Sequence, residues 1–236
     1  MIMEYGFIKY KDGIPIINKR KTISILANRL FLDAMKEVVN YAKGELLDVG
    51  CGESPFYPLF LKRINSYVKT DILTSPGKPD IYSSITALPF KDGGFDTILC
   101  TQVLEHVFDP FCALNEMNRV IRSDGVIIIG TPLIYWIHEA PVDYLRYTRY
   151  FYQKVATIYG FEILYLKEVG GIMSVLVDIL SKGIVSISVR SNYLSFLKSS
   201  SFLLQDIGWF IIDKAFKGDF GSVLINLGYV VAFRKR

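Results

Sequence analysis

The sequence predicts an α/β fold with a doubly wound, mostly parallel sheet, and three patterns support this prediction. Short apolar runs that end in glycine or a polar residue, such as residues 45–50, are typical of strands buried within a parallel sheet. Between them, apolar residues recur at helical spacing. These strands alternate with helices of 10–15 residues, which favours parallel pairing. The length of 236 residues fits one large α/β domain.

The first expected element is a helix over residues 22–43, whose apolar residues form a stripe at the helical period. Gly44 supplies the left-handed stop that helix ends favour. Strands are expected next at residues 45–50, 66–71 and 95–100, because each of these segments is short and apolar.

A second helix is expected to begin at Asp109, a capping residue, with Pro110 in its first turn. We expect this helix to stop before Gly125 and to bury one apolar face, made of Leu114, Met117, Val120 and Ile121. The run of apolar residues at 126–129 is the clearest strand in the sequence.

The last third of the chain continues the alternation with one interruption. Thr148 is expected to cap a helix that Gly160 ends, and strands are expected at 161–169 and 227–233. Residues 172–222 do not fit the alternation and predict two amphipathic helices inserted before the last strand. We therefore divide the chain into an extension with its helix (1–43), a core (44–171), the insertion (172–222) and the final strand (223–236).

Composition excludes several classes of protein. The chain carries 27 Lys and Arg against 23 Asp and Glu, a net charge of +4, and 51% of its residues are apolar. This composition rules out disorder and argues against binding nucleic acid through bulk charge. The mean hydropathy of +0.30 is high for a soluble enzyme, but the most apolar segment, 172–189, contains Asp178 and Lys182, so no membrane span is expected.

No signal peptide is visible in residues 1–13, which lack a long apolar run. The three cysteines, Cys51, Cys100 and Cys112, form no C-x-x-C pair. We therefore expect neither a disulfide framework nor a metal site, and a reducing, cytoplasmic location.

A glycine loop follows the first expected strand of the core. Gly50 and Gly52 allow a tight turn and a close approach to the backbone, while Asp48 before them favours a cationic amine over a pyrophosphate. Asp71 follows Gly52 by 19 residues, at the distance where nucleotide sites place an acceptor for ribose hydroxyls. From the spacing alone, a turn and a strand-end aspartate that bind no ligand are as well supported as a nucleotide site.

Four motifs in order make the interpretation specific: Leu46-Leu-Asp-Val-Gly-Cys-Gly52, then Asp71, then Leu88-Pro-Phe with Phe95-Asp96, then Val103-Leu-Glu-His-Val107 with Asp109-Pro110. This order resembles the class I S-adenosylmethionine-dependent methyltransferases, especially the subgroup with the L-P-F…F-D…L-E-H-V pattern. The resemblance implies a Rossmann-like sheet of seven strands whose last strand is antiparallel. It also implies that S-adenosylmethionine is the cofactor, bound across the first two strands of the core.

The resemblance assigns roles to matching positions. Asp48 and Gly50 would contact the methionine end, Cys51 follows Gly50 in the same loop, and Gly52 would allow close approach. Asp71 would accept from the ribose and Ile72 would pack on the adenine. Ser84, beside Ile85, stands where many members carry an acidic residue for the adenine amino group. Thr101 and Gln102 would line the methionine and sulfonium portion.

The methyl acceptor is expected at the loop of residues 131–148. This loop contains one of the only two histidines, His138, and its H-x-x-P-x-D-x-x-R-Y-T spacing resembles methyltransferases linked with cell-surface sugar or lipid metabolism. Our hypothesis makes His138 a general base, with Tyr144 and Arg146 orienting the acceptor. Two roles stay open for Arg146, which either pairs structurally with Asp143 or clamps an anionic acceptor. His106 is expected to pack at a helix start.

Three functions remain. The first is methyl transfer to a small molecule, by O-methylation of a glycan, a lipid precursor or a quinone-like compound. The second is an RNA or protein methyltransferase, although the N-terminal basic stretch gives no strong nucleic-acid signal. The third is a cofactor-binding module without activity. Residues 172–222 are expected to form a lid or an interface, including a homodimer interface, with peripheral contact to a membrane as the alternative.

Overall fold

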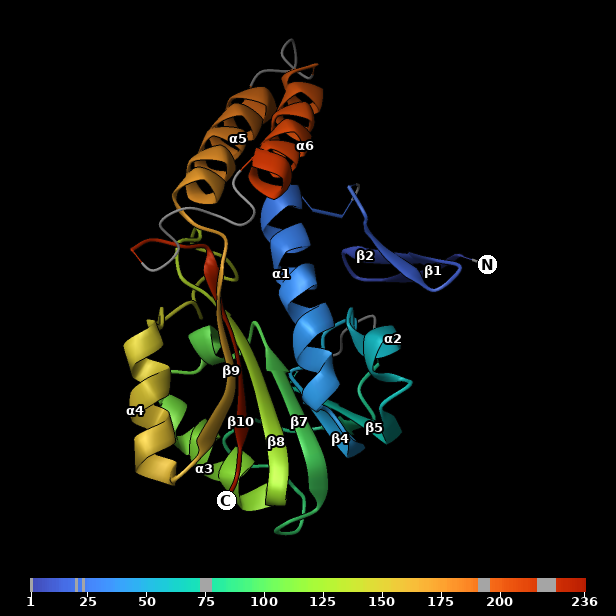
Figure 1. The fold of residues 1–236 in the computed structure, drawn as a ribbon, viewed down its shortest axis with the longest axis vertical. Coiled ribbons are helices and arrows are strands. Elements are labelled where there is room, and N and C mark those ends of the chain that lie inside the picture. Colours follow the sequence, from blue (N-terminus) through green and yellow to red (C-terminus); the bar gives the residue numbers. More distant parts are fainter. Residues whose placement is uncertain (1, 20, 23, 73–77, 191–195, 216–223) are drawn as a thin grey trace. The chain divides into compact units, whose positions relative to one another are not determined.

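The computed structural model describes residues 2–19, 21–22, 24–72, 78–190, 196–215 and 224–236 (Figure 1). The chain divides into two compact units. One contains Met1–Asp33 and Glu168–Leu227, and the other contains Ala34–Lys167 and Gly228–Arg236.

The larger unit is built on a seven-stranded sheet in the order β6-β5-β4-β7-β8-β10-β9. The strands are β4 (Gly44–Val49), β5 (Ile64–Asp71), β6 (Ile81–Tyr82), β7 (Phe95–Thr101), β8 (Ile121–Pro132), β9 (Glu162–Val169) and β10 (Gly228–Arg234). Strand β4 pairs in parallel with β5 and β7, β7 pairs in parallel with β8, and β10 pairs antiparallel to β8. The predicted doubly wound sheet with an antiparallel last strand is confirmed.

Helices α3 (Pro110–Val120) and α4 (Arg149–Tyr159) pack against this sheet through one apolar core (Figure 1). Leu114 and Met117 of α3 and Tyr152 of α4 are fully or almost fully buried there, beside Ile98 and Ile127 of the sheet. Strands covered in this way are apolar almost throughout, which is why their runs were recognisable in the sequence.

The boundaries of these helices test the capping predictions. Asp109 caps α3, because its carboxylate accepts from the backbone N–H groups of Phe111 and Cys112. Thr148 occupies the N-cap position of α4, but its side chain makes no capping hydrogen bond to this described helix. Gly160 ends α4 in the left-handed conformation, with φ of 67°.

Two predicted helix ends were wrong. Helix α3 stops at Val120, because Ile121 already pairs with Phe95 as the first residue of β8. Helix α1 covers Ile25–Val38, followed by a 3-10 turn at Val39–Tyr41, and is therefore shorter than residues 22–43. Gly44 does not end it but begins β4, where a Cβ atom would lie 2.1 Å from Oδ2 of Asp96.

The smaller unit contains a three-stranded antiparallel sheet that the sequence analysis missed. Its strands are β1 (Ile2–Tyr5), β2 (Ile8–Lys11) and β3 (Ile14–Ile17). In β2, Ile8 and Tyr10 are buried while Lys9 and Lys11 are not, which is the alternation of a half-buried strand.

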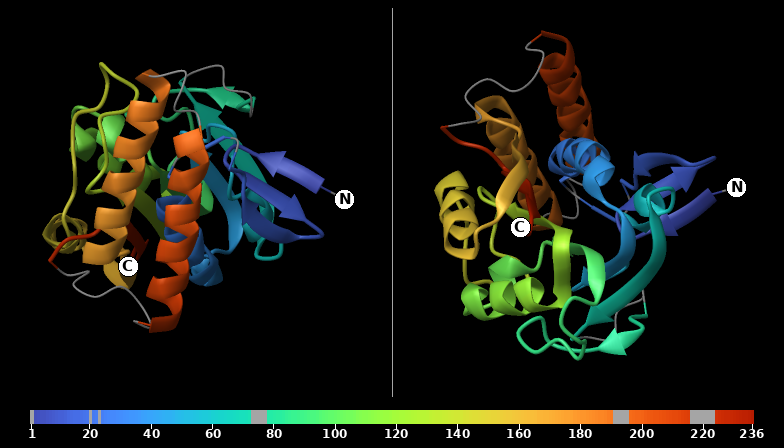
Figure 2. Two further views of the ribbon diagram at one scale, coloured as in Figure 1. Left: turned by 90° about the horizontal axis from the view of Figure 1, so that it is seen from above. Right: turned by 60° about the horizontal axis from the view of Figure 1, so that its bottom comes forward.

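The same unit holds the predicted helical insertion as α5 (Ile172–Arg190) and α6 (Phe196–Ala215), which lie side by side (Figures 1 and 2). The predicted positions 191–195 and 216–222 lie outside the described residues. A short helix, α2 (Tyr57–Phe60), belongs to the larger unit. Among the described helices, none is both long and apolar enough to cross a membrane.

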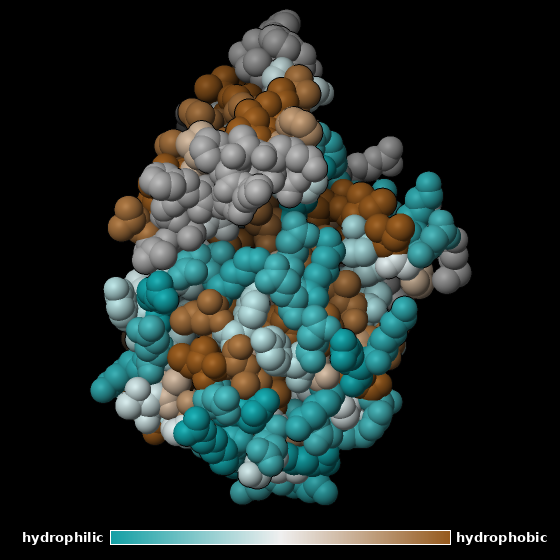
Figure 3. Space-filling model, in the orientation of Figure 1, coloured by the Kyte–Doolittle hydropathy of each residue, from teal (hydrophilic) through white to brown (hydrophobic). Residues whose placement is uncertain are grey.

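Helices α5 and α6 bury polar residues and expose apolar ones. The buried polar side chains are Ser174, Asp178, Ser181, Lys182, Ser201 and Gln205. The exposed apolar side chains include Leu176, Ile179, Leu180, Leu203, Ile207 and Phe210, and hydrophobic side chains gather over these helices in Figure 3. Of the predicted apolar stripe of α5, Val175 is buried, whereas Leu176, Ile179 and Leu180 face outward.

Hydrogen bonds explain this arrangement. The Ser201 hydroxyl donates to the Ser181 carbonyl at 3.1 Å, and the Gln205 side chain accepts from the Leu26 N–H at the start of α1 at 3.0 Å. Asp178 and Lys182 form a buried ion pair. Polar partners therefore hold the inner face together, and the apolar face is left at the surface.

Candidate functional site

The glycine loop leaves β4 at the carboxyl edge of the sheet, next to the point where the strand order reverses between β4 and β7. Ligands of open α/β sheets bind at this position. Gly50 has φ of +66°, and a Cβ atom there would lie 2.4 Å from Cγ2 of Val103. Gly52 has φ of +51°, and no atom of the described residues lies within 4 Å of where its Cβ would be. The first glycine is thus required by packing, and the second keeps space open beside the loop.

Asp71 ends β5 and is bonded to this loop. Its Oδ2 accepts from the Gly52 N–H at 2.9 Å, so the structure joins two residues that are 19 positions apart. Ile72, next in the chain, is 68% exposed although it is large and apolar. A carboxylate beside an exposed apolar side chain suits a ligand with hydroxyls and a flat ring.

Asp48 lies buried at the end of β4 and accepts from the Tyr67 hydroxyl at 2.5 Å. Burial, with a smaller contribution from the charge of Asp71, raises the pKa of Asp48 to about 7, although the hydrogen bond from Tyr67, the Ser54 hydroxyl and the charge of Lys69 oppose the shift. Burial also raises the pKa of the Cys51 thiol to about 12, so this cysteine stays protonated at neutral pH. The loop therefore offers a carboxylate for a cation and no reactive thiolate.

The remaining predicted cofactor residues lie shortly after β6 and at the end of β7. The Ser84 hydroxyl bonds to the Thr86 hydroxyl at 2.8 Å and accepts from the Thr86 N–H at 3.2 Å. Ile85 is only 6% exposed and belongs to the apolar core, so little of it faces solvent. Thr101 is the last residue of β7, and Gln102 follows with φ of +56° while its N–H donates to the Gly130 carbonyl at 2.7 Å.

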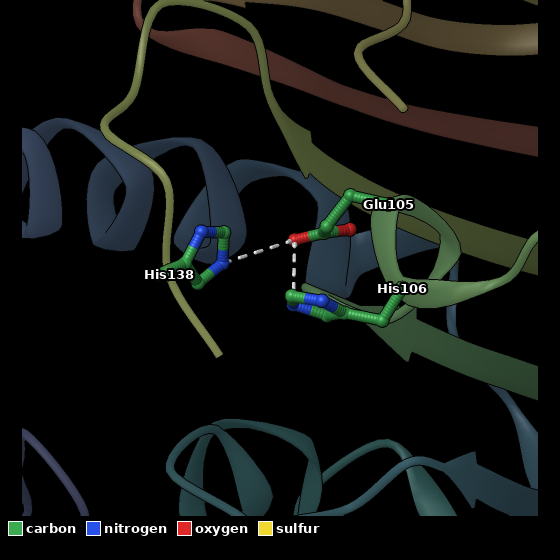
Figure 4. A group of neighbouring side chains, drawn as sticks. All are labelled: Glu105, His106 and His138. Atoms are coloured by element: carbon green, nitrogen blue, oxygen red, sulfur yellow. Dashed lines mark ion pairs between the residues drawn. The ribbon is translucent and has the colours of Figure 1, made fainter. Parts of the chain in front are cut away.

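The two histidines meet a glutamate at the same edge of the sheet (Figure 4). The 3-10 turn Leu104–His106 presents Glu105 and His106, and the loop after β8 presents His138. The loop is fastened to the turn, because the N–H groups of Tyr144 and Leu145 donate to the Glu105 carbonyl at 2.9 and 3.2 Å. The two imidazole rings lie 4.7 Å apart, edge to face.

Asp143 and Arg146 form a bidentate ion pair next to His138. The guanidinium donates to both carboxylate oxygens, at 2.5 and 2.9 Å, and these bonds hold the pKa of Asp143 well below its usual range. The same carboxylate accepts from the His138 backbone N–H at 2.9 Å and lies 3.2 Å from its Nδ1. Of the two roles considered for Arg146, the structure contains the pairing with Asp143.

The aromatic residues of the loop surround this cluster on one side. The Tyr135 ring lies 5.2 Å from the His138 ring, and the Tyr144 ring packs edge to face on Phe108 at 5.6 Å. Trp136 and Tyr144 are 44% and 45% exposed, so both present surface to solvent. The loop thus places aromatic rings beside the polar cluster.

Glu105 is the site residue that the sequence analysis did not identify. It is fully buried, and neither carboxylate oxygen has a hydrogen-bond partner among the described residues. Burial raises the pKa of Glu105 to about 8. The L-E-H-V motif indicated a turn near the cofactor, but only the fold shows that His138 comes back to it.

Comparison with known proteins agrees with this geometry. Residues 47–129 match the family described as methyltransferase domain. An uncharacterized protein of Methanocaldococcus jannaschii is 38% identical over 101 residues, which are 40% of this chain and 44% of that protein. A tRNA U34 carboxymethyltransferase of Nautilia profundicola is 26% identical over 56% of this chain and 50% of its own length. A ubiquinone biosynthesis O-methyltransferase of Pseudomonas aeruginosa is 26% identical over 50% of this chain and 55% of its own length.

A solved structure supports the fold over the whole chain. The putative sarcosine dimethylglycine methyltransferase of Galdieria sulphuraria superposes with a TM-score of 0.55 at 15% identity, covering 98% of this chain and 92% of that one. The fold and the glycine loop are similar to those of the class I S-adenosylmethionine-dependent methyltransferases. The match to the methyltransferase domain extends over residues 47–129, about a third of the chain. The chain spans about half the length of the curated relatives it matches.

Proposed function

We propose that this chain binds S-adenosylmethionine at the glycine loop and transfers its methyl group to an oxygen of a small-molecule acceptor. The observation that carries the proposal is the arrangement at one sheet edge. Gly52 is bonded to Asp71, and Gly50 packs on Val103, which immediately precedes the turn that holds Glu105 and His106. Cofactor loop and candidate acceptor cluster are therefore consecutive parts of one surface.

The residues present fit the cofactor. Gly52 leaves open space, Asp71 offers a carboxylate, and Ile72 offers an exposed apolar face. We assign the cofactor to Asp48, Gly50, Cys51, Gly52, Asp71, Ile72, Ser84, Ile85, Thr101 and Gln102. The bound cofactor would supply a methyl group that is already activated, so the protein has to align the acceptor and handle its proton.

The acceptor proton is assigned to the cluster around His138. Asp143 and the Trp136 carbonyl, at 3.2 and 3.3 Å, both face Nδ1 of His138, so this nitrogen carries hydrogen and Nε2 keeps its lone pair. Arg146 positions Asp143, and Tyr144 presents its ring at the loop surface. An imidazole nitrogen with a free lone pair can accept the proton of an acceptor hydroxyl.

The test is methyl transfer from labelled cofactor to a panel of hydroxyl-bearing glycans, lipid precursors and quinols. Transfer to one of them that is lost in His138→Ala supports the proposal. The relative that is named a tRNA U34 carboxymethyltransferase makes RNA the second candidate. Labelling of total RNA but of no small molecule would therefore replace the first candidate by the second. Cofactor binding with no transfer to either panel would support a binding module.

We also propose that the apolar outer face of α5 and α6 is an interface between two copies of this chain. It presents Leu180 and Phe210, each 58% exposed, on helices whose inner faces already make hydrogen bonds within the chain. Sedimentation should show a dimer that Leu180→Ser with Phe210→Ser converts to a monomer. A monomeric wild-type chain that binds lipid vesicles would refute this and identify the face as a membrane contact.

A further inference from the structure

Two imidazoles and one carboxylate converge on a common point in the turn and loop described above. One ligand atom from each of Glu105, His106 and His138 lies within 4.8 Å of the others (Figure 4). Glu105 Oε1 lies 3.9 Å from Nε2 of His106 and 4.0 Å from Nε2 of His138. These separations are too long for hydrogen bonds, so the three atoms face one another without a direct bond.

The hydrogen positions on both rings follow from their other contacts. His106 Nδ1 lies 2.7 Å from the Val142 carbonyl, which only accepts, so this nitrogen donates. His138 Nδ1 faces Asp143 and the Trp136 carbonyl, which are also acceptors. Both Nε2 atoms therefore keep their lone pairs in the neutral rings, and both point toward Glu105. Histidine ligands of metals are usually held in this way, by a carbonyl or carboxylate on the other ring nitrogen.

Glu105 provides a second, independent observation. It is 0% exposed, and both of its carboxylate oxygens lack a hydrogen-bond partner among the described residues. A buried carboxylate without a partner is costly, and native structures compensate it with a proton, an ion pair or a bound cation. The Glu139 side chain is 68% exposed, and its Oε2 lies 3.8 Å from Nε2 of His106.

We propose that Glu105, His106 and His138 bind one divalent transition-metal cation through Oε1 and the two Nε2 atoms. Two imidazoles and one carboxylate leave open coordination positions and favour zinc, manganese, iron or cobalt over magnesium or calcium. Ligand atoms of a tetrahedral zinc are roughly 3.4 Å apart, so each of the two nitrogens would move about 0.5 Å closer to Oε1 of Glu105 on binding. A closure of this size is within the reach of side-chain rotation.

The inference rests on the proposed function and specifies how the acceptor loses its proton. An acceptor hydroxyl on an open position of the cation would have a lowered pKa, and its proton would leave to water. The oxygen would then form a bond to the methyl carbon while the carbon–sulfur bond breaks, and the sulfonium would become a neutral thioether. With the cation bound, Nε2 of His138 is a ligand and cannot take up the proton, so the cation would replace His138 in the base role proposed above for the site without metal.

The experiment uses the full chain without added histidines, treated with a chelator and titrated calorimetrically with zinc or manganese chloride. We expect one equivalent to bind. The chain has only two histidines, so nitrogen NMR of labelled histidine should show both Nε2 signals shifting while both Nδ1–H protons remain. Glu105→Gln, which preserves volume, should weaken binding by about 100-fold or more, since it removes a direct ligand.

The control is Glu139→Gln, which removes a carboxylate close to His106 and should change the affinity less than about threefold. No metal binding by wild type would overturn the inference, as would equal losses in Glu105→Gln and Glu139→Gln. Binding of S-adenosylhomocysteine, measured in the same samples, separates the two proposals. If it binds and the metal does not, only the metal site is refuted. If it does not bind, the proposed function is refuted.

Discussion

The affinity for S-adenosylmethionine should rise with pH through neutrality, because Asp48 must ionise to receive a cationic amine. Burial raises the pKa of this carboxyl to about 7. The groups that face it are the Tyr67 hydroxyl, the Cys51 thiol, Asp71 and Lys69, and only Lys69 is a cation. The protonated form therefore predominates in mildly acidic solution without the cofactor.

The magnitude follows from the fraction ionised. With a pKa of about 7, about 9% of Asp48 is ionised at pH 6 and about 76% at pH 7.5, so the affinity should increase about eightfold. Calorimetric titration with S-adenosylmethionine at these two pH values measures the change. Asp48→Asn should bind more weakly at pH 7.5 and should lose this pH dependence.

The same group makes a prediction for stability. Its pKa is about 7 in the folded chain and about 3.9 in the unfolded chain, so the folded state binds the proton more tightly between these values. Its contribution is therefore fully present below about pH 4 and is lost as pH rises toward 7, at about 1.4 kcal/mol per pH unit. Asp48→Asn should remove this slope in urea unfolding.

Asp124→Asn is the matched control, because Asp124 is exposed and its φ of +59° suits asparagine equally well. It should leave both the affinity and its pH dependence unchanged. A wild-type affinity that is flat between pH 6 and pH 7.5 would refute the effect of burial on Asp48. Equal affinity of Asp48→Asn and wild type at pH 7.5 would refute its role in binding.

Three further predictions concern stability, each measured by urea unfolding. Gly50→Ala should cost about 2–4 kcal/mol, since it adds a clash to an unfavourable φ, whereas Gly52→Ala meets no atom of the described residues and should cost about 1 kcal/mol. At protein concentrations low enough to keep the chain monomeric, Val175→Ser should cost about 2–4 kcal/mol, whereas Leu180→Ser, on the exposed face of α5, should stay within about 0.5 kcal/mol; a larger loss there would show that this face is packed within the chain itself. Tyr152→Phe removes a hydroxyl buried against Thr131 and should cost about 1–2 kcal/mol, with a neutral result contradicting that bond.

The parts of the fold that were predictable from sequence depend on local patterns. Strands β4, β7 and β8 are buried on both faces and read as apolar runs, and Asp109 with Pro110 marks the start of α3 within two residues. The end of α3 was not predictable, because Ile121 is apolar and fits either a helix or a strand. The pairing of Ile121 with Phe95 on β7 places it in a strand, and this contact joins residues that are distant in the sequence.

For helices α5 and α6 the prediction of which face is buried was wrong. Their apolar residues were recognised, but an amphipathic stripe is normally expected to face the core. Here Gln205 bonds to Leu26 and Ser201 bonds to Ser181, so the polar stripe is the packed one. The sequence contains the periodicity of these helices, whereas the direction of each face depends on partners distant in the chain.

The spacing of the loop after β8 acquires a physical reason from the structure. His138 and Asp143 are five residues apart because the loop folds back, so that one carboxylate accepts from the backbone N–H of His138 and faces its Nδ1. Arg146 follows three residues after Asp143, and its guanidinium donates one hydrogen bond to each oxygen of this carboxylate. Between them, Val142 supplies the carbonyl that orients His106. One short segment thus contacts both imidazoles, because it contains His138 and supplies the carbonyl that bonds to His106, and this is why the two histidines meet at Glu105 although they are far apart in the sequence.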